Sequence, residues 1–254
     1  MAMDTDVPII DTAIQGWRDA MAAREKMPTL FWVAIAVMIG LGLLHFLSGV
    51  WLFLPLLSGV VFSVAQALAL TPLAIAVHRF VLLDEIHDSY DFAPGDPRFQ
   101  KFFVFTIALE LLGAIPQVIA YLFAAVSTFL SSIVLLVLAV VTTIVAVRTV
   151  ILFPSIAVDA TGAEWRNAMA DTKGQSWSVF FVLVCAVLPA SVVSIVVVAL
   201  FSASWLLTLV VLGFILPVIT VFMVAAVAAA VSRLFAAYAN QLGQPTNLHL
   251  RAVV

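Results

Sequence analysis

The chain alternates long apolar runs with short polar stretches that hold nearly all of its charges. Three apolar runs stand out, at 30–83, 102–153 and 176–238, and each is more than 50 residues long. A helix that crosses the hydrocarbon core of a bilayer needs about 20 residues, so each run suits two crossings joined by a turn. Serine, glycine and proline residues near the middle of each run mark these turns.

This pattern predicts an all-α polytopic membrane protein with six transmembrane helices in three hairpins. Composition agrees, because 65% of the residues are hydrophobic and only 10% are charged, which excludes an ordinary soluble domain. The predicted spans are 30–47, 56–82, 102–126, 133–153, 176–201 and 205–237. We interpret residues 1–254 as one integral membrane domain. Its successive parts are an N-terminal segment with an interfacial helix (1–29), a first hairpin (30–82), an acidic cytoplasmic loop (83–101), a second hairpin (102–153), a loop with a second interfacial helix (154–175), a third hairpin (176–238) and a tail (239–254).

Basic residues are confined to one side of this arrangement. With an even number of spans, the N-terminal segment, the two charged connections and the tail share one side, and all 11 Lys and Arg belong to it. The positive-inside rule makes that side the cytoplasm, so we expect a multi-pass protein of the plasma membrane with both termini cytoplasmic. The residues are Arg18, Arg24, Lys26, Arg79, Arg98, Lys101, Arg148, Arg166, Lys173, Arg233 and Arg251.

A six-residue motif occurs twice, each time just before an odd-numbered predicted span. The copies at 17–22 and 165–170 are 148 residues apart and identical at five of six positions. We interpret the chain as three related hairpin units in parallel orientation, of which the middle one is degenerate.

Both copies predict an amphipathic helix in the inner headgroup layer. In the first, Ile10, Ile14, Trp17 and Met21 are spaced to share one narrow helical face, and in the second Trp165 shares a face with Met169. These helices are either simple topological anchors or a collar that senses lipid or docks a partner. The candidate contact residues are Trp17, Arg18, Met21, Trp165, Arg166 and Met169.

The middle of the chain resembles a known type of membrane protein. Arg148, Pro154, an amphipathic segment, the pair Lys173-Gly174 and then Trp177 at the start of the next span occur in that order. This order resembles poorly characterised bacterial six-span inner-membrane proteins of the YciC-like type, and the membrane domain attached to some glycerophosphodiester phosphodiesterases. The resemblance implies an α-helical protein of the bacterial inner membrane without an established activity, and the chain holds no phosphodiesterase domain.

One acidic residue, Glu110, falls well inside a predicted span, about 12 Å beyond Phe102. A charge at mid-bilayer costs about 3 kcal/mol, so we expect this side chain to face the bundle and to be paired or protonated. Arg148 is the preferred partner and Arg79 the second. The site is either a structural contact between helices or a site for a proton or cation. The candidate intramembrane polar site consists of Glu110, Gln66, Thr106, Gln117, Arg148 and Arg79.

The connection at 84–98 carries five acidic residues and His87. The spacing of these side chains fits neither an EF-hand nor a zinc pattern. We expect a solvated acidic loop, with weak divalent-ion binding or docking of a basic partner as the alternatives.

The sequence contains no H-E-x-x-H, G-x-S-x-G, P-loop or dinucleotide fingerprint. We therefore expect no enzymatic activity, no catalytic, cofactor-binding or metal-ligating residues, and no nucleic-acid partner. The leading hypothesis is a protein that acts through contacts with membrane lipids or partner proteins, a homo-oligomer included, as a scaffold, accessory subunit or lipid-responsive protein. The alternative is a small transporter or channel with an intramembrane site around Glu110.

Overall fold

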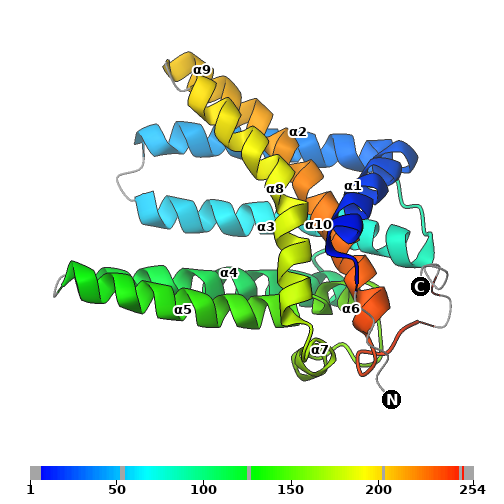
Figure 1. Cartoon of the computed structure of the whole chain (residues 1–254). Helices are drawn as coiled ribbons and strands as arrows, with labels where there is room; N and C mark the ends of the chain where they lie inside the picture. Colours follow the sequence, from blue (N-terminus) through cyan, green and yellow to red (C-terminus); the bar gives the residue numbers. More distant parts are fainter. Residues whose placement is uncertain (1–6, 52–54, 125–126, 202–203, 246–247, 249–254) are drawn as a thin grey trace.

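A computed structural model describes residues 7–51, 55–124, 127–201, 204–245 and 248, and within these ranges the chain is helical without β-strands (Figure 1). Arg251 lies outside the described residues. The helices are α1 (Ile9–Lys26), α2 (Pro28–Trp51), α3 (Pro55–Leu83), α4 (Pro97–Ala124), α5 (Thr128–Thr149), α6 (Leu152–Ala157), α7 (Trp165–Asp171), α8 (Ser176–Phe201), α9 (Trp205–Val210), the π-helical turn η1 (Val211–Ile215) and α10 (Leu216–Tyr238).

Six segments of the described chain are long and apolar enough to cross a membrane, which confirms the predicted all-α polytopic fold. They agree with the predicted spans to within several residues. The third span begins at Pro97, five residues earlier than predicted, because the Asp96 side chain accepts a hydrogen bond from the backbone N–H of Arg98 and so starts the helix. The spanning segments are Pro28–Leu47, Val61–Leu83, Pro97–Ala124, Thr128–Ala157, Ser176–Phe201 and Trp205–Tyr238.

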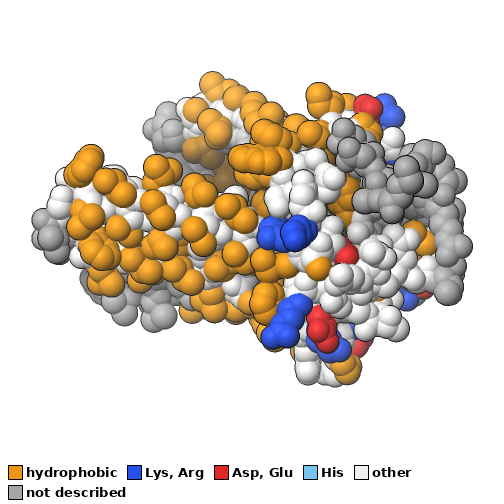
Figure 2. Space-filling model, turned by 60° about the horizontal axis from the view of Figure 1, so that its bottom comes forward, with side chains coloured by type: hydrophobic (Ala, Val, Ile, Leu, Met, Phe, Trp, Pro, Cys, Tyr) orange, Lys and Arg blue, Asp and Glu red, His pale blue; other side chains and the backbone are white. Residues whose placement is uncertain are grey.

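The spans form three antiparallel pairs, α2 with α3, α4 with α5, and α8 with the α9–α10 segment (Figure 1). The ends at which these helices pair lie at the left of Figure 1 for α2 with α3 and for α4 with α5, and at the top for α8 with α9, and we name them the hairpin end. The opposite end carries α1, the loop at 84–96, α6 and α7, and we name it the charged end. On the face shown in Figure 2, hydrophobic side chains cover the half toward the hairpin end, and the charged side chains lie over the other half.

Helix α10 is the centre of the packing and contacts α1, α2, α3, α6 and α8. Five alanines between Ala225 and Ala230 are buried in it. Small side chains let neighbouring backbones approach closely, which is how helices associate where lipid removes the hydrophobic driving force. In contrast, α4 and α5 are largely exposed and apolar on most sides, as lipid-facing helices are.

The loop at 84–96 is largely exposed, in agreement with the predicted solvated acidic loop, and two of its side chains fasten it to neighbouring helices. Asp88 accepts hydrogen bonds from the backbone N–H groups of Thr29 and Leu30, at 2.7 and 3.4 Å, and thereby caps the start of α2. The hydroxyl of Tyr90 donates to the carbonyl of Ala69 in α3 at 2.6 Å, and burial raises the pKa of this phenol above its usual value. The negative charges of this loop therefore serve helix starts and ion pairs.

Candidate functional site

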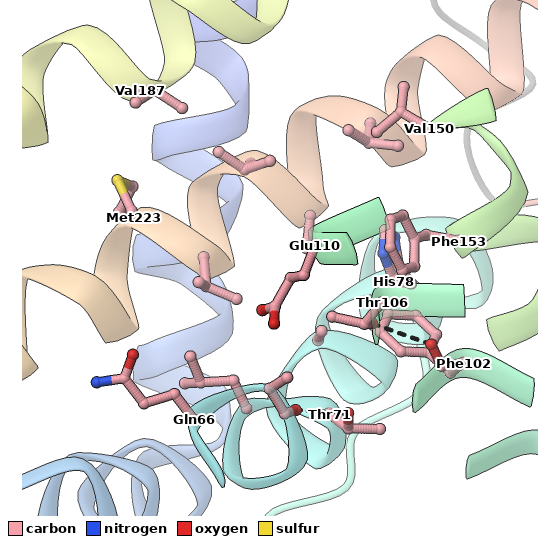
Figure 3. A pocket seen from close by; sticks show the side chains of 17 residues that line it. Gln66, Thr71, His78, Phe102, Thr106, Glu110, Val150, Phe153, Val187 and Met223 are labelled. Carbon is pink, nitrogen blue, oxygen red and sulfur yellow. Dashed lines mark hydrogen bonds between the residues drawn. The ribbon is translucent and has the colours of Figure 1, made fainter. Parts of the chain in front are cut away.

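A cavity of about 380 Å³ lies between α3, α4 and α10, in the membrane-spanning part of the molecule (Figure 3). Its periodic lining explains its position. On α4 the lining residues Phe102, Thr106 and Glu110 are four apart, so they share one helical face. On α3 the face runs from Gln66 to His78, and α10 contributes apolar side chains from Met223 to Val231.

Glu110 is exposed on α4 and its carboxylate points into the middle of this cavity (Figure 3). Its hydrogen-bond partner is the hydroxyl of Ser63 on α3, which donates to Oε2 at 2.7 Å. Among the residues that the structure describes, no Lys, Arg or His lies within ion-pair distance of Glu110. The prediction that Glu110 faces the interior of the bundle is thus met by a cavity rather than by a sealed contact.

The predicted ion pair between Glu110 and Arg148 is wrong. Arg148 lies in the last turn of α5 and turns toward α7, where its guanidinium donates to the backbone carbonyl of Met169. The hydroxyl of Thr172 in turn donates to the Arg148 carbonyl at 2.9 Å. Arg148 therefore joins α5 to the segment after it at the charged end and is not part of the cavity.

Arg79, the second expected partner, is occupied elsewhere as well. Its guanidinium bonds Glu85 at 2.6 Å and donates to the carbonyl of Ala157 at 2.9 Å. Asp159 lies 3.7 Å from the same guanidinium. Because Arg79 follows His78 by one residue, it is turned about 100° away from the cavity face of α3.

Of the remaining predicted polar residues, Gln66 and Thr106 line the cavity with Glu110, and Gln117 does not. Gln117 is exposed on α4, and its amide lies beside the carbonyls of Gly113 and Ala114 in its own helix. The hydroxyl of Thr106 donates to the carbonyl of Phe102 at 2.9 Å.

Sequence reasoning missed a polar contact at the charged end of the cavity. His78 Nδ1 lies 2.8 Å from Oγ of Ser232, a contact between α3 and α10 that is buried on both sides. The Ser232 hydroxyl donates to the carbonyl of Ala228 at 3.0 Å, so it accepts from Nδ1–H and leaves the lone pair of Nε2 on the other side of the ring. The lone serine that follows the alanine run of α10 is the signal that marks this contact in the sequence.

The first copy of the repeated motif lies in α1, which crosses the charged ends of α8 and α10 (Figure 1). The face of α1 that contacts protein consists of small residues, Thr12, Ala13, Gly16, Ala20 and Ala23. An ion pair between Asp19 and Arg233, at 2.6 Å, fastens α1 to α10. The indole N–H of Trp17 donates to the carbonyl of Ala186 at 2.9 Å, in the turn of α8 before Pro189.

Three of the four residues of the predicted apolar stripe of α1 face away from the protein, and the fourth, Trp17, packs against it. Ile10 is 66% exposed, and Ile14 and Met21 are each 45% exposed. At about 100° per residue these three residues lie roughly 130° around the helix from the small-residue face, and the charged residues Asp11, Arg18 and Glu25 lie about 60° further round, next to the stripe. The helix thus has one face toward the protein and an outer face on which apolar and charged residues adjoin.

The second copy lies in α7 and is held in a different way. Trp165 is 56% exposed and the guanidinium of Arg166 lies 5.7 Å from the centre of its ring. Ala168 is buried, and the Met169 carbonyl accepts from Arg148. Asp171 accepts backbone N–H bonds from 240–242 at 2.9 to 3.0 Å, which fastens α7 to the segment after α10.

Comparison of the chain with protein-family models, with curated proteins and with solved structures found no match. The resemblance to six-span inner-membrane proteins stays a prediction. Within the part of the chain that the structure describes, no group of three or more His, Cys, Asp or Glu side chains could hold a metal ion.

Proposed function

We propose that this protein is a non-enzymatic multi-pass protein of the bacterial inner membrane that acts through contacts with membrane lipid. The observation that carries the proposal is helix α1, which is fastened to the spanning helices on one face and exposes an apolar stripe on another. Partner proteins or a second copy of the chain are the alternative occupants of that stripe.

The proposed orientation rests on the charges. In the described residues, Lys and Arg belong to the segments at the charged end, or to the helix turns next to it, and not to the turns of the hairpin end. Because membrane proteins keep Lys and Arg on the cytoplasmic side, we assign the charged end and both termini to the cytoplasm. The bacterial assignment is supported by the resemblance in the sequence.

Lipid contact gives the exposed stripe a favourable environment. Removing the exposed parts of Ile10, Ile14 and Met21 from water contributes about 3 kcal/mol, at 1.5 to 3 kcal/mol for a whole side chain of this size. Arg18 and Glu25, which flank the stripe, then lie toward the headgroups and water. An interfacial helix held in this position follows the lateral packing of the lipid around it, which is the basis of a lipid-responsive role.

The experiment compares two neighbouring exposed positions on α1 that point about 100° apart. Nitroxide labels are attached to Ile10→Cys and Asp11→Cys in a Cys185→Ser background, in protein reconstituted into lipid nanodiscs. We expect the label at 10 to be relaxed by oxygen, which concentrates in lipid, and the label at 11 by a water-soluble nickel complex. Equal access of the nickel complex to both labels would show that the stripe faces water and would refute the lipid contact.

A second candidate function, transport, is favoured by the cavity that holds Glu110. A carboxylate exposed to a cavity within the spans is a common device for moving protons or cations. For this function, Glu110→Gln should abolish a pH-dependent flux in proteoliposomes. Wild-type protein that shows no flux of protons, sodium or potassium would remove the support for transport.

A further inference from the structure

We propose that the cavity between α3, α4 and α10 is a binding site for a lipophilic amine, whose ammonium group pairs with Glu110. This site is independent of the lipid contact of α1. It also requires only binding, so it stands whether or not the bound molecule is carried across the membrane.

The charge of Glu110 is the first argument. Glu110 is 13 residues from the start of α4 and 14 from its end, so it lies about 20 Å from either end of the helix. An ionised carboxylate at this depth costs about 3 kcal/mol unless a positive group accompanies it. Ser63 supplies one hydrogen bond to Oε2, and no basic side chain of the described chain reaches the carboxylate. A ligand with a positive charge would complete this site.

The polar groups of the lining favour a ligand that is positively charged and donates hydrogen bonds over a ligand that is an anion. The hydroxyls of Thr71 and Thr106 each donate to a carbonyl of their own helix, at 2.8 and 2.9 Å, and the Ser63 hydroxyl donates to Glu110. These groups offer a ligand acceptor lone pairs and a carboxylate, and the amide of Gln66 adds an acceptor oxygen and two N–H donors. An ammonium group has three N–H donors and matches the carboxylate and the acceptors, whereas a phosphate or carboxylate would lie against the negative charge of Glu110.

The walls of the cavity determine the other part of the ligand. Leu70, Val187, Val224 and Val227 present hydrocarbon, and Met223 adds an unbranched side chain that adapts to ligands of irregular shape (Figure 3). The volume of about 380 Å³ is within the range of pockets that enclose small organic molecules. The ligand is therefore a compact hydrocarbon or aromatic body with one ammonium group, which reaches the cavity from the bilayer.

The experiment uses three probes that share one apolar cage: 1-adamantylammonium, 1-adamantanol and adamantane-1-carboxylate. Binding to the whole protein in nanodiscs is measured by equilibrium dialysis, with empty nanodiscs as the baseline. We expect the ammonium to bind at least tenfold more tightly than the alcohol, and the carboxylate not to bind above the baseline. Equal binding of ammonium and alcohol, or no binding of the ammonium above the baseline, would overturn the proposal.

Substitutions test whether the ammonium binds in this cavity. Glu110→Gln should abolish the preference for the ammonium, and Glu110→Asp, which keeps the charge, should retain it. Val227→Phe should weaken binding of both the ammonium and the alcohol, because it fills the cavity. The matched controls are Glu25→Gln, on the exposed face of α1, and Val137→Phe, on the lipid-facing side of α5, and neither should change binding. An ammonium preference that survives in folded Glu110→Gln would place the site elsewhere and contradict the proposal.

Discussion

Replacing Gly16 by alanine tests the close contact that fastens α1 to α10. A Cβ atom at Gly16 would lie 2.8 Å from Cβ of Ala230 and 2.9 Å from the carbonyl oxygen of Ala226. Carbon atoms in contact prefer about 3.5 to 4.0 Å, and neither of these neighbours is the end of a flexible side chain. Helix α1 must therefore move away by nearly 1 Å, which also stretches the bonds of Trp17 to Ala186 and of Asp19 to Arg233.

The expected loss is about 1 to 2 kcal/mol. Crowding of this kind costs about 2 to 3 kcal/mol, and the higher helix propensity of alanine returns up to about 1 kcal/mol. Gly40→Ala is the matched control. Like Gly16, Gly40 lies within a helix, but it is exposed, and a Cβ there meets nothing within 4 Å. Gly40→Ala should leave the free energy of unfolding unchanged or raise it by up to about 1 kcal/mol.

Both variants are unfolded by titration with sodium dodecyl sulfate from mixed micelles, followed by tryptophan fluorescence. Opposite signs for the two substitutions are the predicted result. If Gly16→Ala stabilises the protein as much as Gly40→Ala does, α1 does not lie against α10 at this distance, and the description of α1 as a fastened helix is refuted.

Three further predictions concern the charged end. Asp88→Ala should lower the free energy of unfolding by about 1 kcal/mol in the same titration, because the start of α2 loses its cap. The pKa of Tyr90 is raised in the folded protein, so its contribution to the free energy of unfolding is complete below the ordinary pKa of 10.0 and is lost as the pH rises through the folded-state value. Tyr90→Phe should therefore reduce the loss of stability above pH 10. Tyr121→Phe, at an exposed position, is the control and should leave that loss unchanged. A double-mutant cycle of Asp19→Asn and Arg233→Gln should give a coupling energy of about 1 kcal/mol, since both side chains are largely buried, and additive effects would contradict the ion pair.

The number and positions of the spans could be predicted from the sequence because long apolar runs between charged segments have few other interpretations. Pro217, in the last span, has no backbone N–H for a regular helical hydrogen bond. The structure has a π-helical turn, Val211–Ile215, directly before it, which accommodates the backbone N–H that proline lacks.

The partners of the site residues could not be predicted, because helical periodicity gives the face of a residue but not the helix opposite that face. Arg148 lies in a predicted span and is therefore the preferred ion-pair partner of Glu110 in the sequence, yet its side chain turns toward α7. The contact between His78 and Ser232 joins residues 154 positions apart, which no local pattern reveals. For α1 the sequence pattern groups Trp17 with Ile10, Ile14 and Met21, but only the last three are exposed, whereas the indole of Trp17 bonds to α8. The face that contacts protein is the small-residue face, because close packing of helices favours alanine and glycine over bulky side chains.

The proposed architecture has six crossings that leave the charged connections on one side of the membrane. Single cysteines replace Thr128 and Ser204 at the hairpin end, and Lys101 and Lys173 at the charged end, in the Cys185→Ser background. A membrane-impermeant maleimide is then applied to intact cells and to permeabilised cells. The account predicts that positions 128 and 204 react in intact cells and that positions 101 and 173 react only after permeabilisation. Reaction of 101 and 173 from opposite sides would contradict it.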